Sequence, residues 1–133
     1  MKLNELTIKQ ASEQLAGSEI TSVELTKACL ARIKEVNGKV KACLTVCDNE
    51  AMKAAEEADK RLANGEKGRL LGVPCLIKDI IMTAGIRTTA ASKILENYIA
   101  PYDATIVKKL KDAGTVILGK TNLDEFAHGA STE

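Results

Sequence analysis

The sequence predicts an α/β protein in which helices cover both faces of a mixed sheet. Apolar residues recur at helical spacing through much of residues 1–65, whereas residues 70–82 form a mostly apolar run that suits a strand covered on both faces. A second apolar run at residues 115–118 follows another stretch with helical spacing. The order of strand, helix and strand is typical of a βαβ unit in a largely parallel sheet.

The first part of the chain, residues 1–65, is predicted to be mainly helical. A short amphipathic helix is expected to end near Gly17. Thr21 followed by Glu24 forms a capping box for a second helix, which the Asn-Gly pair at 37–38 is expected to stop.

A short strand and a third helix are predicted next. Residues 40–46 carry the β-branched and apolar side chains of a strand. Asp48 then opens a helix with an alanine-rich face, and the Asn-Gly pair at 64–65 closes it.

Residues 66–133 are predicted to begin the α/β core. Asp103 is expected to cap the crossover helix and Gly114 to end it, directly before the strand at 115–118. Residues 1–133 together are expected to form one partial domain.

The composition fits a globular protein that does not bind nucleic acid through charge. Of the 133 residues, 45% are hydrophobic and 28% charged, and 19 basic against 18 acidic residues leave a net charge of +1. If an RNA takes part, another chain is expected to hold most of its backbone. There is no apolar run of membrane-spanning length and no signal-peptide core at the start, which predicts a cytoplasmic protein.

The cysteines are expected to be free thiols in a reducing compartment. Cys29, Cys43, Cys47 and Cys75 lie in apolar surroundings and form no C-x-x-C pair. A zinc site from Cys43, Cys47 and the single histidine, His128, is the alternative, but a loop position without a role is favoured for His128.

Lys78 is the most informative single residue, because it interrupts the apolar run at 70–82. One interpretation is that it pairs with Asp79 or reaches solvent from the strand end. Adjacent strand residues point to opposite faces, however, so Asp79 is poorly placed to neutralise it. The functional interpretation is a buried lysine that serves as a general base, and the residues alone leave both open.

Residues 114–121 match the phosphate-loop pattern G-x-x-x-x-G-K-[ST]. That motif needs a strand before a flexible loop, whereas here a helix comes first and four apolar or β-branched residues fill the loop. A strand that ends in a polar turn with a solvated Lys120 is therefore favoured over a nucleotide site.

The last residues, 129–133, follow a strand without a closing element. A parallel sheet that ended there would leave an edge unpaired, which predicts that the chain is part of a longer protein.

Several segments resemble the amidase-signature family, and within it the ammonia-generating subunits of tRNA-dependent amidotransferases. The matching segments are residues 68–74 leading into Ile77-Lys78-Asp79, residues 88–95, residues 101–105 and residues 116–126, together with residues 22–25 in the opening helices. The resemblance covers essentially the whole chain. It implies the N-terminal part of the amidase-signature fold, with its helices first and the fold incomplete.

The resemblance also implies a catalytic site. It places the catalytic lysine of a Ser–cis-Ser–Lys triad at Lys78 and a substrate-binding residue at Ser131. The lysine deprotonates a bridging serine, which activates the serine that attacks the amide of glutamine and releases ammonia. The Gly/Ser-rich segment that carries both serines in the family is absent from this sequence, so the chain alone is expected to be inactive.

The family further implies partners. Ammonia is expected to pass to a B subunit, which uses ATP and magnesium to convert Glu-tRNA(Gln) to Gln-tRNA(Gln), or Asp-tRNA(Asn) to Asn-tRNA(Asn). A small C subunit is expected to hold A and B together. No cofactor or metal is expected in this chain itself, and tRNA is expected to contact it only through the B subunit.

Two departures from the family pattern and two alternative functions remain. Ile80 stands where the family usually has Asn, and Ala130 stands where it usually has Ser. A general amidase of the same family with another amide substrate is one alternative. A non-catalytic module that binds the B or C subunit through its N-terminal helices is the other.

Overall fold

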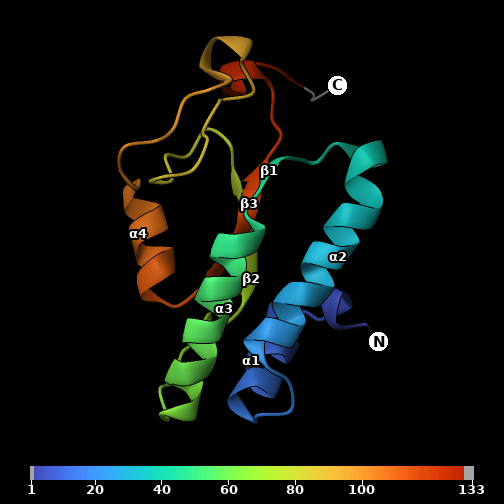
Figure 1. Cartoon of the computed structure of the whole chain (residues 1–133), viewed down its shortest axis with the longest axis vertical. Helices are drawn as coiled ribbons and strands as arrows, with labels where there is room; N and C mark the ends of the chain where they lie inside the picture. Colours follow the sequence, from blue (N-terminus) through green and yellow to red (C-terminus); the bar gives the residue numbers. More distant parts are fainter. Residues whose placement is uncertain (1, 131–133) are drawn as a thin grey trace.

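A computed structural model describes residues 2–130 and has a three-stranded sheet between helices (Figure 1). The α-helices are α1 (Ile8–Ala16), α2 (Ser22–Val40), α3 (Asp48–Ala63) and α4 (Thr105–Asp112). The strands are β1 (Cys43–Val46), β2 (Pro74–Lys78) and β3 (Val116–Thr121). Three 3-10 turns complete the order: η1 (Leu3–Glu5), η2 (Lys93–Leu95) and η3 (Glu125–Ala127).

The sheet is mixed, with strand order β1-β3-β2. β2 and β3 are parallel and are joined through α4, which confirms the expected βαβ unit, and β1 pairs with β3 in the antiparallel direction. The β2–β3 register shifts once, because Cys75 pairs with Ile117 whereas Leu76 pairs with Gly119. β3 therefore carries one extra residue, a β-bulge, and this bulge places Lys120 opposite Ile77.

Helices cover both faces of the sheet, as the sequence predicts. Val116 and Leu118 of β3 pack with residues of α2 and α3, and Ile117 packs with Ile77 and with Val107 of α4. In Figure 1, α2 and α4 lie on opposite sides of the strands. The three strands are thus held between two apolar clusters that different helices supply.

The amino-terminal end of β2 is closed by polar contacts as well as apolar ones. The buried Ser22 donates a hydrogen bond from Oγ to the Gly72 carbonyl, 2.8 Å away. The Asp59 carboxylate of α3 accepts from the amides of Ser22 and Val23 at 2.6 and 3.1 Å. Asp59 therefore satisfies two amides at the start of α2 that no intrahelical bond could use.

The capping box at Thr21 and Glu24 is present, but α2 ends later than predicted. It continues to Val40, and Lys41 follows in the left-handed conformation. The Asn37 side chain does not stop the helix. It instead bonds to Cys43, accepting from the amide at 2.8 Å and donating to the carbonyl at 3.0 Å. Asn37 thus attaches the last turns of α2 to the start of β1.

One further expectation is confirmed over a shorter range, and another is wrong. The run at 70–82 yields a strand only from Pro74 to Lys78, because Gly72 turns the chain before it with a φ of +79° and a turn follows at Asp79. Asp103 does not cap α4, whose N-cap is Ala104 without a side-chain hydrogen bond. The Asp103 carboxylate instead accepts from the Ala84 amide at 2.7 Å and pairs with Lys111 at 2.8 Å.

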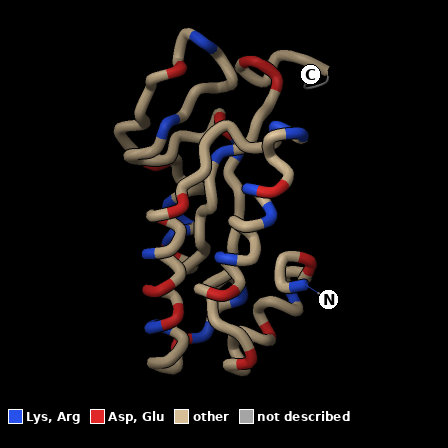
Figure 2. The backbone as a smooth tube through the Cα atoms, turned by 45° about the vertical axis from the view of Figure 1, so that its right-hand side comes forward, with Lys and Arg blue, Asp and Glu red and all other residues tan. Residues whose placement is uncertain are grey.

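Charged residues of both signs are interleaved along the helices rather than gathered by sign (Figure 2). This distribution agrees with the near-zero net charge of +1. Within residues 2–130, no helix is both long enough and apolar enough to cross a membrane.

Candidate active site

The carboxyl ends of β2 and β3 meet at one edge of the sheet, because the two strands are parallel. Lys78 is the last residue of β2 and pairs with Thr121, the last residue of β3. The loops that follow both strands gather at this same end of the molecule (Figure 1). Such an edge is where ligand sites of α/β sheets form.

Lys78 and Asp79 have opposite surroundings although they are neighbours in the chain. The Lys78 side chain is exposed, whereas Asp79 is 0% exposed. The expectation that Asp79 cannot neutralise Lys78 from the other face is therefore consistent with the structure. Lys78 is not a buried lysine in this chain, and its side chain is accessible at the sheet edge.

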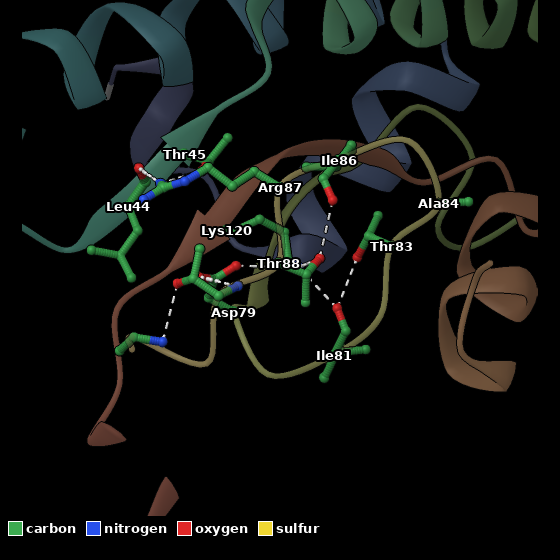
Figure 3. Close-up of polar contacts among 12 residues, drawn as sticks. Leu44, Thr45, Asp79, Ile81, Thr83, Ala84, Ile86, Arg87, Thr88 and Lys120 are labelled. Carbon is green, nitrogen blue, oxygen red and sulfur yellow. Dashed lines mark hydrogen bonds and ion pairs between the residues drawn. The ribbon is translucent and has the colours of Figure 1, made fainter. Parts of the chain in front are cut away.

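The fully buried lysine of this edge is Lys120, where the sequence predicts a solvated turn residue, so that prediction is wrong. Its ammonium donates to the Ile81 carbonyl at 2.8 Å and to Thr88 Oγ1 at 2.9 Å (Figure 3). It also lies 3.4 Å from Asp79 Oδ1. Both side chains of this Lys120–Asp79 pair are 0% exposed.

Asp79 is held by its backbone as well as by its carboxylate. Its amide donates to the Thr121 carbonyl at 3.0 Å, and its carbonyl accepts from the Ala90 amide at 2.9 Å. Oδ2 accepts from the Thr89 amide at 3.1 Å and from the Thr89 hydroxyl. Oδ1 has no hydrogen bond, so the ammonium of Lys120 is its compensating charge.

The electrostatics of the pair follow from burial. Desolvation lowers the pKa of Lys120, and the nearby Asp79 carboxylate opposes that shift. Three partners compensate the buried ammonium: Asp79, Ile81 and Thr88.

Arg87 links the loop after β2 to the outer strand β1. Its guanidinium donates to the Leu44 carbonyl and to Thr45 Oγ1, both at 3.2 Å, and also to the Glu96 carbonyl. Figure 3 shows Arg87 directed toward β1 and Thr88 directed toward Lys120 from the same stretch of chain. The loop is thus fixed to two strands.

The backbone next to Asp79 adopts a conformation that alanine rarely takes. Ala90 and Ala91 have φ values of +52° and +54°. A left-handed conformation costs a residue with a Cβ roughly 1–2 kcal/mol, and such residues persist only where the surroundings hold them. The Ala90 amide donates to Asp79 and the Ala90 carbonyl accepts from Phe126, so this loop is held from both sides.

The phosphate-loop pattern does not form a nucleotide site. Residues 116–121 are the strand β3 itself, and Gly119 and Lys120 are both buried in the sheet. A Cβ at Gly119 would overlap the Thr45 carbonyl oxygen, so this glycine permits close approach of β1. The glycine-lysine pair therefore serves sheet packing rather than phosphate binding.

The remaining predicted residues are His128, the four cysteines and Ser131. His128 is exposed, and residues 2–130 contain no group of three or more His, Cys, Asp or Glu side chains arranged to hold a metal. All four cysteines are free, and burial raises the pKa of Cys75 to about 11. Ser131 lies outside the described residues.

The buried role of Lys120, with its partner Thr88, and of Thr89, which donates to Asp79, was not predicted from the sequence. Two signals could have revealed them. Asp79 follows Lys78 with the opposite orientation and needs a cation of its own once it is buried. The apolar run at 115–118 continues through Gly119, so Lys120 is a strand residue between two neighbours rather than a turn residue.

The exposed Lys78 and the buried Lys120–Asp79 network thus lie together at the carboxyl edge of the sheet. Residues 24–133 match the amidase family, so the chain belongs to that family. The chain is similar to the A subunit of the glutamyl-tRNA(Gln) amidotransferase of Desulfatibacillum aliphaticivorans, with 58% identity over 133 residues, all of this chain and 27% of that protein. It is 53% identical, over the same shares of both chains, to the A subunit of the same enzyme from Geotalea daltonii.

The solved structures agree with this assignment. Native peptide amidase from Stenotrophomonas maltophilia superposes with a TM-score of 0.87 at 36% identity, and the match covers 93% of this chain and 26% of the amidase. The expected fold, the N-terminal part of an amidase-signature enzyme, is therefore correct. The chain spans about a quarter of the length of the relatives it matches.

Proposed function

We propose that this chain is part of the A subunit of a tRNA-dependent amidotransferase, the subunit that hydrolyses glutamine to supply ammonia. The observation that carries the proposal is the 58% identity, along all 133 residues, to the A subunit of a glutamyl-tRNA(Gln) amidotransferase. Structural similarity to a peptide amidase, at 36% identity, supports amide chemistry in general and is weaker evidence for glutamine as the substrate.

Lys78 is proposed as the base of the Ser–cis-Ser–Lys triad. It lies at the carboxyl end of β2, and its exposed side chain is free to meet serines that the other parts of the enzyme bring to this edge. The lysine takes the proton of the bridging serine, which in turn takes the proton of the nucleophilic serine. The nucleophilic oxygen bonds to the amide carbon of glutamine, the C–N bond breaks as the nitrogen takes a proton from the triad, and ammonia leaves; water then hydrolyses the acyl-enzyme to release glutamate.

The whole enzyme is proposed to contain B and C subunits. The B subunit binds ATP and magnesium, activates Glu-tRNA(Gln) and receives the ammonia, and tRNA reaches this chain only through B. The 133 residues lack both serines, so the polypeptide by itself hydrolyses no amide.

A hybrid subunit tests this function. In the hybrid, this chain replaces the aligned 27% of the Desulfatibacillum aliphaticivorans protein, and ammonia release from glutamine is measured in the assembled complex. We expect activity in the hybrid, and a loss of roughly 10²–10⁴-fold in kcat when Lys78→Ala removes the base. A folded hybrid without activity would contradict the proposal, and an active Lys78→Ala variant would contradict the role of Lys78.

Two other functions make different predictions. A general amidase would be encoded by a gene whose reading frame continues past Glu133 into a Gly/Ser-rich segment and whose product, expressed without B and C subunits, cleaves other amides. A subunit-binding module would be encoded by a frame that stops there, and the chain would purify with B or C without activity. Sequencing the source DNA past the Glu133 codon is therefore the first step in separating them.

A further inference from the structure

Stability alone does not explain the buried Lys120–Asp79 pair. Both side chains are 0% exposed, and burying two charges has a desolvation cost that their attraction often only balances. Well-packed apolar residues of similar size would give comparable stability. The pair therefore calls for another explanation, and its place in the fold supplies one.

One member of the pair, Asp79, directly follows Lys78 in the chain. The Asp79 amide bonds to Thr121 at 3.0 Å, which extends the β2–β3 ladder past Lys78. The Asp79 carboxylate is held by Lys120 and Thr89 on the opposite face. Because alternate residues point to opposite faces, fixing Asp79 inward also fixes the direction in which Lys78 leaves the strand.

Lys120 extends the same restraint to the loop. Its ammonium bonds to the Ile81 carbonyl at 2.8 Å and to the Thr88 hydroxyl at 2.9 Å. The residues from Asp79 to Ala91, including the strained pair Ala90 and Ala91, are thereby attached to β3. The network orders the chain on the carboxyl side of Lys78.

The pair itself is inaccessible to substrate in this chain. Neither side chain has exposed surface, and every contact described for Lys120 is to the protein. An effect on catalysis must therefore act through another residue, and Lys78 is the adjoining ionisable group with an accessible side chain.

We propose that the buried Lys120–Asp79 pair, with Thr88 and Thr89, is a positioning device that presents Lys78 in one orientation at the carboxyl edge of the sheet. The inference rests on the proposed function, in which Lys78 is the base. Lys120 and Asp79 are positioning residues and take no proton in the reaction. A base held within a narrow range of positions reacts faster, and a displacement of about 1 Å costs roughly 10²-fold.

The test replaces the pair with uncharged side chains of similar shape in the hybrid subunit. Asp79→Asn keeps an oxygen for the Thr89 donors, and Lys120→Met keeps the length of the lysine without its charge or donors. Removing both partners together avoids an unpaired buried charge, so the double variant is expected to fold. A matched control is Asp103→Asn with Lys111→Met, the other Lys–Asp pair of the same βαβ unit, 2.8 Å apart.

We expect the double variant at the sheet edge to lose roughly 10–100-fold in kcat with KM within about threefold, and the control to keep its kcat within about twofold. The decisive measurement repeats both in a Lys78→Ala background. If the pair acts through Lys78, its removal changes the residual ammonia release by less than about twofold there. A general structural effect would lower the residual rate by the same factor as before.

Hydrogen exchange gives a readout that does not depend on activity. The Thr89 amide bonds to the Asp79 carboxylate and the Ala90 amide to the Asp79 backbone carbonyl. Both amides should exchange faster in the double variant, because Lys120 no longer anchors the loop at Ile81 and Thr88, and at unchanged rates in the control. An unchanged kcat in a folded double variant, or an equal loss in the Lys78→Ala background, would overturn the inference while leaving the proposed function intact. An inactive wild-type hybrid would overturn the proposed function and the role of Lys78 with it, and unchanged exchange would then show that the pair does not order this edge either.

Discussion

The ends of β2 and β3 lie side by side, but their lysines differ in burial. Lys78 ends β2 with an exposed side chain, whereas Lys120, one residue before the end of β3, is 0% exposed and has three partners. β2 is an edge strand of this sheet, whereas β3 is paired on both sides. In this sheet the central strand β3 has its lysine, Lys120, buried, whereas the edge strand β2 leaves its last residue, Lys78, accessible.

The largest expected effect comes from replacing Lys120, the buried lysine near the end of β3. Lys120→Met in the 133-residue chain should lower the free energy of unfolding by about 3–5 kcal/mol, because it leaves the Asp79 carboxylate buried without a cation. Lys78→Met, on the exposed side, should change it by less than about 0.5 kcal/mol. Urea unfolding of the two variants measures the contrast, and equal effects would contradict the difference between the strand ends.

A smaller effect is expected where β1 covers β3. Gly119→Ala places a Cβ against the Thr45 carbonyl, a backbone atom that cannot move aside without disturbing the β1–β3 ladder. We expect a loss of about 1–3 kcal/mol in unfolding free energy. Gly38→Ala is the control, because a Cβ there has no atom within 4 Å. A neutral Gly119→Ala would show that β1 is not pressed against β3 as described.

The attachment of β1 to α2 should matter somewhat less. Asn37→Ala removes two hydrogen bonds to Cys43, at 2.8 and 3.0 Å, and should cost about 1–2 kcal/mol. The measurement is again urea unfolding, with hydrogen exchange at the Cys43 amide as a local readout. Slow exchange that persists at Cys43 in the variant would show that another group protects the start of β1.

The smallest expected effect is a pH dependence of stability at Asp103, whose carboxylate bonds to Ala84 in the loop that follows β2. Burial alone would raise the pKa of Asp103, but the Lys111 ammonium and the Ala84 amide outweigh it and hold that pKa below its ordinary value. The folded state therefore binds fewer protons at Asp103 than the unfolded state, so its contribution is present above about pH 4 and is lost as the pH falls through the folded pKa. Asp103→Asn should flatten the acid limb of a stability–pH curve by less than roughly 1 kcal/mol, and an unchanged limb would contradict the assignment.

Local signals in the sequence were sufficient for most of the fold. The capping box at Thr21 and Glu24, the closing turn after α3 and the apolar strands on both sides of α4 all lie within short stretches, and each predicts its element correctly. The predicted end of α2 was wrong because the Asn37 side chain bonds to Cys43, six residues later, and does not stop the helix. The predicted capping role of Asp103 was wrong for a similar reason, since its carboxylate bonds to Ala84 and Lys111.

The site was only partly predictable because it depends on register. Strict alternation would put Lys120 on the same face as Val116 and Leu118, against α2 and α3. The bulge after Ile117 brings Lys120 opposite Ile77 instead, where Asp79 follows two residues later on the same face. No pattern in either strand predicts that bulge, so the sequence can indicate that a buried Asp79 needs a cation but not that Lys120 supplies it. The catalytic role of Lys78 remains a prediction from family resemblance.

The burial of the Lys120–Asp79 pair also bears on temperature. Hydration of charged groups becomes less favourable on heating, so the desolvation cost of a buried ion pair falls as temperature rises, whereas apolar stabilisation levels off. The apolar clusters around α2, α3 and α4 follow the second trend. On warming, therefore, the carboxyl edge of the sheet should keep its order relatively better than the helices that surround it.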